Sequence, residues 1–235
     1  MNNDALKTCQ EKKTYLEKAL AISSDYAQKF TLLKQIEECD EEIARLKKSA
    51  TTEIDNNKVL SEALAQFAKM PIDIIPSVDA LPEHSRMPLS PNLNFVGREH
   101  DLKAIAQAFK AGATASISQA ATVTGMGGLG KTQLACEFVH KYGQYFLGGV
   151  FWLSFADAKV IEGEISLCGG ADGLNLYADA EQLSLKEQVS RVKAAWCEPI
   201  PRLLVFDNCE DPQLLTQWKP AFRGCHVLVT SRSGE

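Results

Sequence analysis

The sequence lacks the features that would place the protein in a membrane or in an oxidising compartment. No stretch approaches the roughly 18 consecutive apolar residues of a membrane-spanning helix, and the start, MNNDALKTCQEKK, lacks the apolar core of a signal peptide. The cysteines are odd in number and never form a C-x-x-C pair, so neither a disulfide framework nor a zinc site is predicted. We therefore expect a cytoplasmic protein with no membrane partner and with free thiols at all seven cysteines (9, 39, 136, 168, 197, 209 and 225).

A strong charge of either sign is also absent. The net charge is −5 and the isoelectric point is near 5.5, which gives no basic surface signal and argues against nucleic acid as a partner. Hydrophobic residues make up 45% and charged residues 23% of the 235 residues, as is typical of a soluble globular protein. This length accommodates one α/β domain and a smaller appendage.

Residues 1–50 are predicted to form a helical hairpin. Between its two helical pieces, Asp25 and Gln28 have the spacing of a capping box, so a new helix is expected to begin there. Apolar residues in the second piece recur at steps of three and four and form one stripe (Leu33, Ile36, Cys39, Ile43 and Leu46). Because this stripe is too short to stabilise a hairpin alone, we expect the hairpin to self-associate, to pack on an effector, or to stay partly frayed.

Residues 51–94 are predicted to be a linker that contains one short helix near 57–70. Prolines at 71, 76, 82, 88 and 91 follow this helix. They impose an extended backbone and exclude a long helix, so the linker is expected to be a semi-rigid tether. A separate domain is expected over residues 95–235.

Helices and strands alternate in this last region, which predicts βαβ units on a mostly parallel sheet and therefore an α/β fold. Residues 157–180 contain several glycines and are expected to be a flexible excursion. Helices are expected near 98–111, 130–142, 181–197 and 212–218, and strands near 120–124, 149–155, 202–206 and 226–230.

One segment, ATVTGMGGLGKTQLACEF, fits two nucleotide-binding signatures. Glycines at the spacing Gly125-x-Gly127-x-x-Gly130 are typical of a dinucleotide-binding turn. The spacing Gly125-x-x-x-x-Gly130-Lys131-Thr132 is typical of a triphosphate-binding loop, in which the lysine reaches the β and γ phosphates and the hydroxyl reaches Mg²⁺. The two signatures predict different ligands.

The acidic residues favour the triphosphate. A dinucleotide site needs an acid at the end of the next strand, but the run VFWLSFAD reaches Asp157 only after Ser154 and Phe155. The buried-strand run LLVFD, by contrast, ends in Asp207, where a carboxylate can be directed at Mg²⁺. The alternative for Asp207 is a strand-end carboxylate that caps the following turn. We predict an ATP or ADP site with Mg²⁺ held by Thr132 and Asp207.

Four motifs in this order, FVGRE, VTGMGGLGKTQLA, RLLVFDN and HVLVTSR, resemble the NB-ARC type of the signal-transducing NTPases with numerous domains (STAND). The resemblance covers about residues 93–232 and implies a three-layer P-loop NTPase fold. The charged hairpin is similar to a short N-terminal segment found on bacterial conflict-system proteins.

The resemblance also implies roles for individual residues. Val96, Gly97 and Arg98 are expected to contact adenine and ribose, and Arg232 to sense the γ-phosphate; the alternative for Arg232 is a surface arginine at a strand end. Lys131, Asp207 and Arg232 are the expected catalytic residues. The expected nucleotide-binding residues are Val96, Gly97, Arg98, Gly125, Gly127, Gly128, Leu129, Gly130, Lys131, Thr132 and Gln133.

Two departures from the family pattern matter. Asn208 stands where the family often has a second acid, and an amide cannot act as a general base, so hydrolysis is expected to be slow or to use Glu210 or Asp211. The chain ends three residues after Arg232, whereas the resemblance implies a further strand, a helical lid and a winged helix. Without them the sheet is expected to be incomplete at its C-terminal end and unpaired beside Val123. We therefore expect the chain to be marginally soluble and to bind nucleotide weakly.

The sequence thus favours a nucleotide-dependent signalling switch whose hairpin engages an effector or itself. A constitutive ATPase and a non-hydrolysing scaffold that works through its N-terminal helices remain as alternatives.

Overall fold

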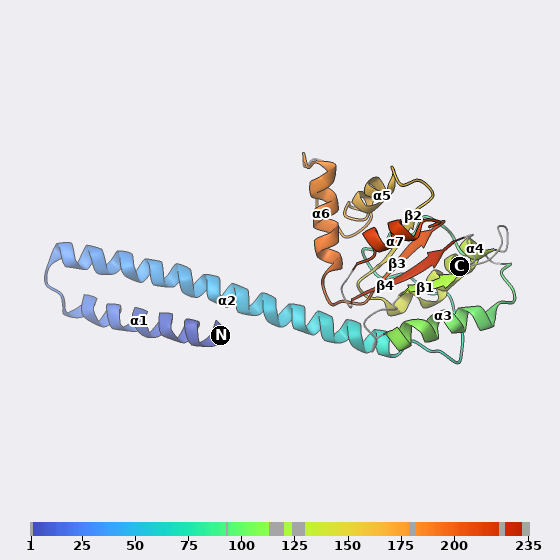
Figure 1. Cartoon of the computed structure of the whole chain (residues 1–235). Helices are drawn as coiled ribbons and strands as arrows, with labels where there is room; N and C mark the ends of the chain where they lie inside the picture. Colours follow the sequence, from blue (N-terminus) through green and yellow to red (C-terminus); the bar gives the residue numbers. More distant parts are fainter. Residues whose placement is uncertain are drawn as a thin grey trace. The chain divides into compact units, whose positions relative to one another are not determined.

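A computed structural model of the chain describes residues 2–92, 94–112, 120–123, 130–178, 182–220 and 224–231. The chain divides into two compact units, Met1–Val59 and Leu60–Glu235. Figure 1 shows the helices and strands of both units in sequence colours. Among the described helices, none has both the length and the apolar composition needed to cross a membrane.

The first unit is a helical hairpin formed by α1 (Asn2–Ile22) and the first part of α2 (Tyr26–Ala68). A helix begins after this turn, as predicted, but the contacts differ from the predicted capping box of Asp25 and Gln28, since Asp25 Oδ1 accepts a hydrogen bond from Ala27 N at 3.0 Å. Ser23 Oγ donates to Gln28 Oε1 at 2.7 Å and closes the turn from the other side. The side chains of this turn therefore set where α2 begins.

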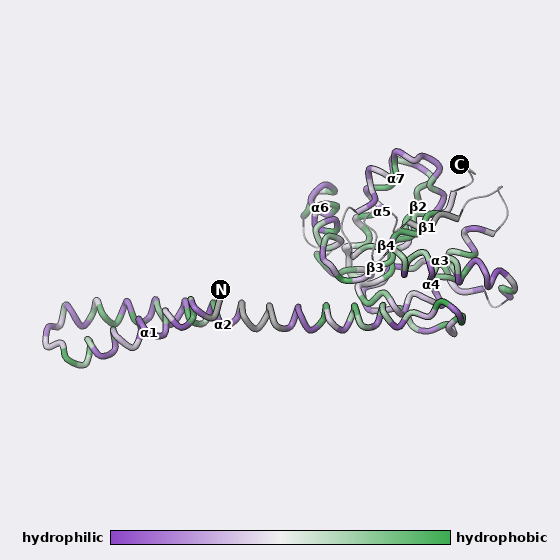
Figure 2. The backbone as a smooth tube through the Cα atoms, turned by 60° about the horizontal axis from the view of Figure 1, so that its bottom comes forward, coloured by the Kyte–Doolittle hydropathy of each residue, from purple (hydrophilic) through white to green (hydrophobic). Residues whose placement is uncertain are grey.

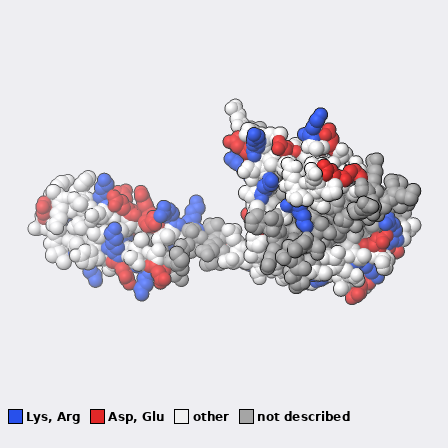
Figure 3. Space-filling model, in the orientation of Figure 1, with Lys and Arg blue, Asp and Glu red and all other residues white. Residues whose placement is uncertain are grey.

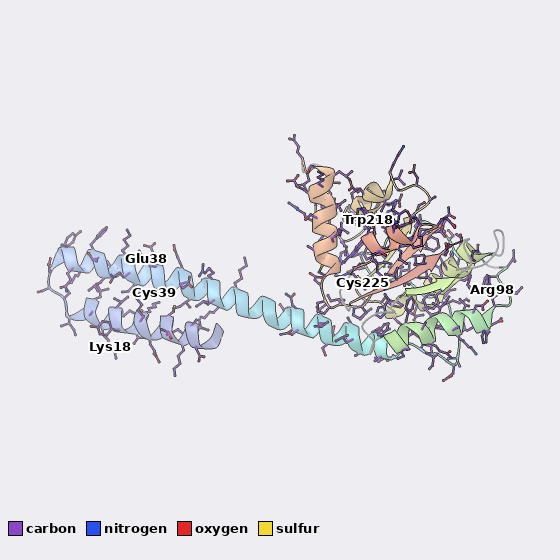
Figure 4. The ribbon with its side chains drawn as sticks, in the orientation of Figure 1. Lys18, Glu38, Cys39, Arg98, Trp218 and Cys225 are labelled. Carbon is purple, nitrogen blue, oxygen red and sulfur yellow. The ribbon has the colours of Figure 1, made fainter. Side chains whose placement is uncertain are left out.

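One narrow seam joins the two helices of the hairpin. Leu16 of α1 is buried, as are Cys39 and Ile43 of α2, and Lys13 Nζ lies 2.6 Å from Asp40 Oδ1 across the seam. Figure 2 shows hydrophobic and hydrophilic residues interspersed along both helices, and Figure 4 shows Cys39 on the side of α2 that faces α1. Leu33, which belongs to the predicted apolar stripe, is 54% exposed.

Helix α2 is continuous from Tyr26 to Ala68, so the predicted separate helix near 57–70 is wrong. The polar stretch SATTEIDNN has no apolar period, which is why the sequence suggested an interruption. It also contains neither glycine nor proline, and the first residue that excludes a helix is Pro71. Backbone propensity rather than amphipathicity therefore sets the end of α2.

The second unit contains a four-stranded parallel sheet in the order β1-β4-β3-β2. The register pairs Val123 with Thr230, Phe206 with Val229, and Ser154 with Asp207. This confirms the predicted mixed α/β fold. Within the described part of the sheet, β1 pairs with β4 alone. The strands are β1 (Ala120–Val123), β2 (Val150–Ser154), β3 (Arg202–Asp207) and β4 (Cys225–Thr230).

Helices cover both faces of the sheet and form two separate hydrophobic clusters (Figure 1). The end of α2 packs on one face together with α3 (Glu99–Gly112), α4 (Lys131–Tyr142) and the short 3-10 helix η1 (Gly143–Tyr145). The other face is covered by α5 (Ile161–Leu167), α6 (Leu185–Trp196) and α7 (Pro212–Trp218). Strand residues alternate between the two clusters, because successive side chains of a strand point to opposite faces.

Residues 70–92, which we call the strap, have the extended backbone that their prolines predict, but they are docked on the domain instead of forming a tether. Arg86 N donates to Val150 O at 2.7 Å, and Trp152 N donates to Arg86 O at 3.0 Å. The Arg86 guanidinium also contacts Glu164 at 3.1 Å. Extended backbone leaves its own donors and acceptors open, and the outer edge of β2 uses them.

Candidate functional site

The candidate site lies at the carboxyl edge of the parallel sheet, where α/β proteins place their ligands. Strand β3 ends there in Asp207, and the neighbouring strand β4 ends in Thr230. Helix α4, which follows the glycine loop in sequence, begins at Lys131. The topology thus brings residues that are far apart in the sequence to one edge.

A pair of hydrogen bonds at the Asp207 carboxylate forms the centre of this site. Thr132 Oγ1 donates to Asp207 Oδ1 at 3.0 Å, and Thr230 Oγ1 donates to the same oxygen at 2.6 Å. The two residues that the sequence predicted as Mg²⁺ ligands, Thr132 and Asp207, are therefore in direct contact. One hydroxyl and one carboxylate are oxygen donors of the kind that Mg²⁺ takes when it keeps several water ligands, so these residues fit the predicted metal.

Thr230 is a site residue that sequence reasoning missed. Its hydroxyl is buried and also accepts a hydrogen bond from Asn208 N at 2.9 Å, while Cys209 N donates to Thr230 O at 2.9 Å. Thr230 therefore fixes both the carboxylate of Asp207 and the backbone that follows it. The signal available in the sequence was a hydroxyl residue that ends the buried run HVLVT, next to a strand that ends in an acid.

Gly130 is the N-cap residue of α4, the helix that follows the glycine loop in sequence. Gly130 has φ 70° and ψ 27°, a left-handed conformation that favours glycine, and its carbonyl accepts from Leu134 N at 2.8 Å. Lys131 is 9% exposed. The side chain of Gln133 donates a hydrogen bond to Glu137 at 3.2 Å, along the helix. The backbone N–H of Gln133, in the first turn of α4, is therefore the group of this residue that suits a phosphate.

The predicted adenine-contacting residues form a turn before α3. Gly97 and Arg98 both have positive φ angles, 77° and 59°, and Val96 is 86% exposed. The Arg98 guanidinium donates to Asp101 at 2.7 Å, and Figure 4 shows Arg98 at the start of α3.

Part of the predicted site falls outside the described residues. These are Gly125, Gly127, Gly128 and Leu129 of the loop and Arg232 beyond β4. Their roles stay predictions.

The residues after Asp207 bear on hydrolysis. Asn208 adopts a left-handed conformation, with φ 60°, which asparagine tolerates well. Asp211 caps α7, since its carboxylate accepts from Gln213 N at 2.8 Å, and Ser231 Oγ donates to Glu210 at 3.3 Å. Both acids that the sequence offered as substitutes for a general base are therefore engaged in local structure.

The sheet topology and the Thr132–Asp207 contact are those of a P-loop NTPase-like fold. No protein-family model matches the chain. The chain is 29% identical over 122 residues to the regulatory protein AfsR of Streptomyces griseus, an alignment that covers 51% of this chain and 12% of AfsR. It is 26% identical over 159 residues to a nucleotide-binding leucine-rich repeat (NLR)-like protein of Hyaloscypha variabilis, with 64% of this chain and 16% of that protein covered.

These relatives support the P-loop NTPase-like fold, and the matched region spans less than one fifth of either protein. Among solved structures, Cdc6p from Pyrobaculum aerophilum is similar to 63% of this chain over 42% of its own, with a TM-score of 0.44 and 16% identity.

Proposed function

We propose that the chain is an ADP- and ATP-binding regulatory NTPase module that acts as a nucleotide-dependent signalling switch. The observation that carries this proposal is the contact between Thr132 and Asp207, which lie 75 positions apart in the sequence and meet at the carboxyl edge of the sheet. The relatives add independent support, since one is named a regulatory protein and the other a nucleotide-binding protein.

In this proposal each side chain has one task. Lys131 binds the β and γ phosphates, and Thr132 and Asp207 hold Mg²⁺, which neutralises phosphate charge when it is bound. Thr230 keeps the Asp207 carboxylate in place through its 2.6 Å hydrogen bond. Val96, Gly97 and Arg98 contact the adenosine portion, and Arg232 senses the γ-phosphate.

Hydrolysis is proposed to be slow. An efficient NTPase needs a residue that orients or deprotonates the attacking water. The amide of Asn208 cannot take up a proton, and Asp211 is already occupied as the cap of α7. Slow turnover suits a switch, because the bound nucleotide then defines a state that persists.

The hairpin is proposed to be the part that engages a partner, either an effector or another copy of the chain. Tyr26 and Phe30 of α2 are 86% and 68% exposed, next to Leu33 on the same side of the helix. Basic and acidic side chains are mixed on the side of the hairpin that Figure 3 shows, so neither sign of charge dominates that side. We further propose that the protein is located in the cytoplasm.

The test is nucleotide titration of the wild type and of Lys131→Ala, with and without Mg²⁺, followed by a turnover assay. A hydrogen bond to a charged group is worth about 1.5–3 kcal/mol, so the variant is expected to lose roughly 10- to 100-fold in affinity for ATP and ADP. Lys141→Ala, at the other end of α4, is the matched control and should bind as the wild type does. Equal affinity in Lys131→Ala and the wild type would refute the proposal, and rapid turnover would indicate an ATPase enzyme instead of a switch.

A further inference from the structure

The helix that begins the candidate phosphate site also holds the strap. Three side chains on one side of α4 contact the backbone of the strap. Cys136 Sγ donates to Ser90 O at 3.4 Å, and His140 Nε2 lies 2.8 Å from Leu89 O. Between them, Glu137 accepts a hydrogen bond from Asn92 N at 2.7 Å. The end of the strap is therefore fixed along one side of α4.

Glu137 is the unusual member of this set, because its side chain is only 2% exposed. A buried carboxylate is costly unless donors compensate for the water that it has lost. The same oxygen, Oε1, accepts from Asn92 N and from Gln133 Nε2 at 3.2 Å. Glu137 thus joins the strap to the first turn of α4 through one atom.

The strap residue that Glu137 holds starts a tight turn. Asn92 Oδ1 accepts from Asn94 N at 3.0 Å, and Asn92 O accepts from Phe95 N at 3.0 Å. Phe95 packs against the hydrophobic cluster on the α3 and α4 face of the sheet. The next three residues are Val96, Gly97 and Arg98, so the turn fixes where that segment begins.

We propose that Glu137 is a positioning residue for recognition of the nucleoside part of the ligand. By holding the Asn92 turn on α4, it sets the Val96–Arg98 segment relative to the helix whose N-terminus meets the phosphates. The inference rests on the proposed nucleotide-binding function and adds that different residues of α4 act on different parts of the nucleotide. Lys131 and Thr132 act on the phosphates, and Glu137, about one and a half turns further along the helix, acts on the base and ribose through the strap.

The experiment compares a ligand that has a nucleoside with one that lacks it. Affinities for ATP and for inorganic tripolyphosphate are measured by calorimetry on the full chain, for the wild type, Glu137→Ala and Glu137→Gln. Glu137→Ala is expected to weaken ATP binding about tenfold, the scale of a lost hydrogen bond to a charged group, and to leave tripolyphosphate binding unchanged. Glu137→Gln keeps a carbonyl acceptor for Asn92 N and should retain ATP affinity within about threefold.

Two further variants separate positioning from a general loss of structure. Asn92→Ala removes the side-chain acceptor of the turn at an exposed position and should reproduce the selective loss of ATP affinity without a change in α4. Glu164→Gln removes the ion pair that anchors the strap at Arg86, beside β2, and should bind both ligands as the wild type does.

The outcomes are distinct. An equal loss of ATP and tripolyphosphate affinity in Glu137→Ala and in Asn92→Ala would overturn the inference, as would ATP affinity unchanged in both. A wild type that binds neither ligand would overturn the proposed function itself, and with it this inference.

Discussion

The two compact units of the chain are stabilised in different ways. Between residues 4 and 48, where side-chain burial is described, the buried hydrophobic side chains are those of Leu16, Cys39 and Ile43, which lie in the seam between the two helices. Between residues 60 and 235, two hydrophobic clusters fill the space on both faces of a parallel sheet. The first unit therefore leaves apolar side chains at its surface, where a partner can reach them, and the second unit uses its apolar side chains to hold a site in place.

The largest effect expected from this difference concerns core truncation. Phe138 is fully buried, stacked on Tyr142 at 4.7 Å and edge-on to Phe109 at 5.6 Å. Phe138→Ala is expected to lower the free energy of unfolding of the domain by about 3–5 kcal/mol. Ile43→Ala, in the seam of the hairpin, is expected to leave that transition unchanged and to reduce helix content alone.

The tryptophans make this contrast measurable. All three, Trp152, Trp196 and Trp218, belong to the second unit, so denaturant unfolding followed by tryptophan fluorescence reports on the domain, and far-ultraviolet circular dichroism adds the hairpin. If Ile43→Ala shifted the fluorescence transition as much as Phe138→Ala does, the two units would unfold as one and the comparison would fail.

The same contrast explains which features of the fold the sequence could predict. The apolar runs LLVFD and HVLVT indicated buried strands directly, because burial on both faces of a parallel sheet leaves a continuous apolar signature. In the hairpin, where burial is shallow, Cys39 and Ile43 of the predicted stripe are buried and Leu33 is exposed. The apolar period marks a helix face, but it does not tell which residues of that face the other helix covers.

In the candidate site, the sequence motifs singled out Thr132 and Asp207, but they did not single out residues that act through local hydrogen bonds. Thr132 and Asp207 were assigned from spacing, and the fold brings them to 3.0 Å. For Thr230 the sequence offers only a hydroxyl at the end of a buried run, and for Glu137 it offers no motif, because a threonine at a strand end or a glutamate on a helix gains its role from the neighbour that the fold supplies. Docking of the strap was missed for a related reason, since it depends on backbone donors and acceptors that every residue has.

A smaller effect, again confined to the second unit, is expected from pH. His226 of β4 is 3% exposed and its ring lies 4.5 Å from that of Phe67, and this burial lowers the pKa of His226 to about 4. In the unfolded chain the pKa is near 6.5, so between these two values the unfolded state binds more protons and stability falls as the pH decreases. The loss should approach about 3 kcal/mol near pH 4.

Unfolding experiments from pH 7.5 to pH 4 on the wild type and on His226→Phe would measure this loss. The variant cannot titrate at this position, so its stability should depend less on pH than that of the wild type. His100→Gln, at a side chain that is 97% exposed, serves as the control and should keep the slope of the wild type. Identical slopes in the wild type and His226→Phe would show that the buried imidazole carries no proton linkage.

The smallest effect on stability, and the largest on association, is expected at the exposed face of the hairpin. Phe30→Asp places a charge on a side chain that is 68% exposed, so the free energy of unfolding should change by less than about 0.5 kcal/mol. If the face that carries Tyr26 and Phe30 mediates self-association, the same change should lower the average mass observed in sedimentation experiments at a given concentration. Gln35→Asp introduces the same charge at another exposed position of α2 and should leave that mass unchanged. A wild type that stays monomeric at every concentration would exclude self-association and leave a separate effector as the partner of this face. An equal decrease of the average mass in Phe30→Asp and Gln35→Asp would assign the effect to the added charge and not to the apolar side chains.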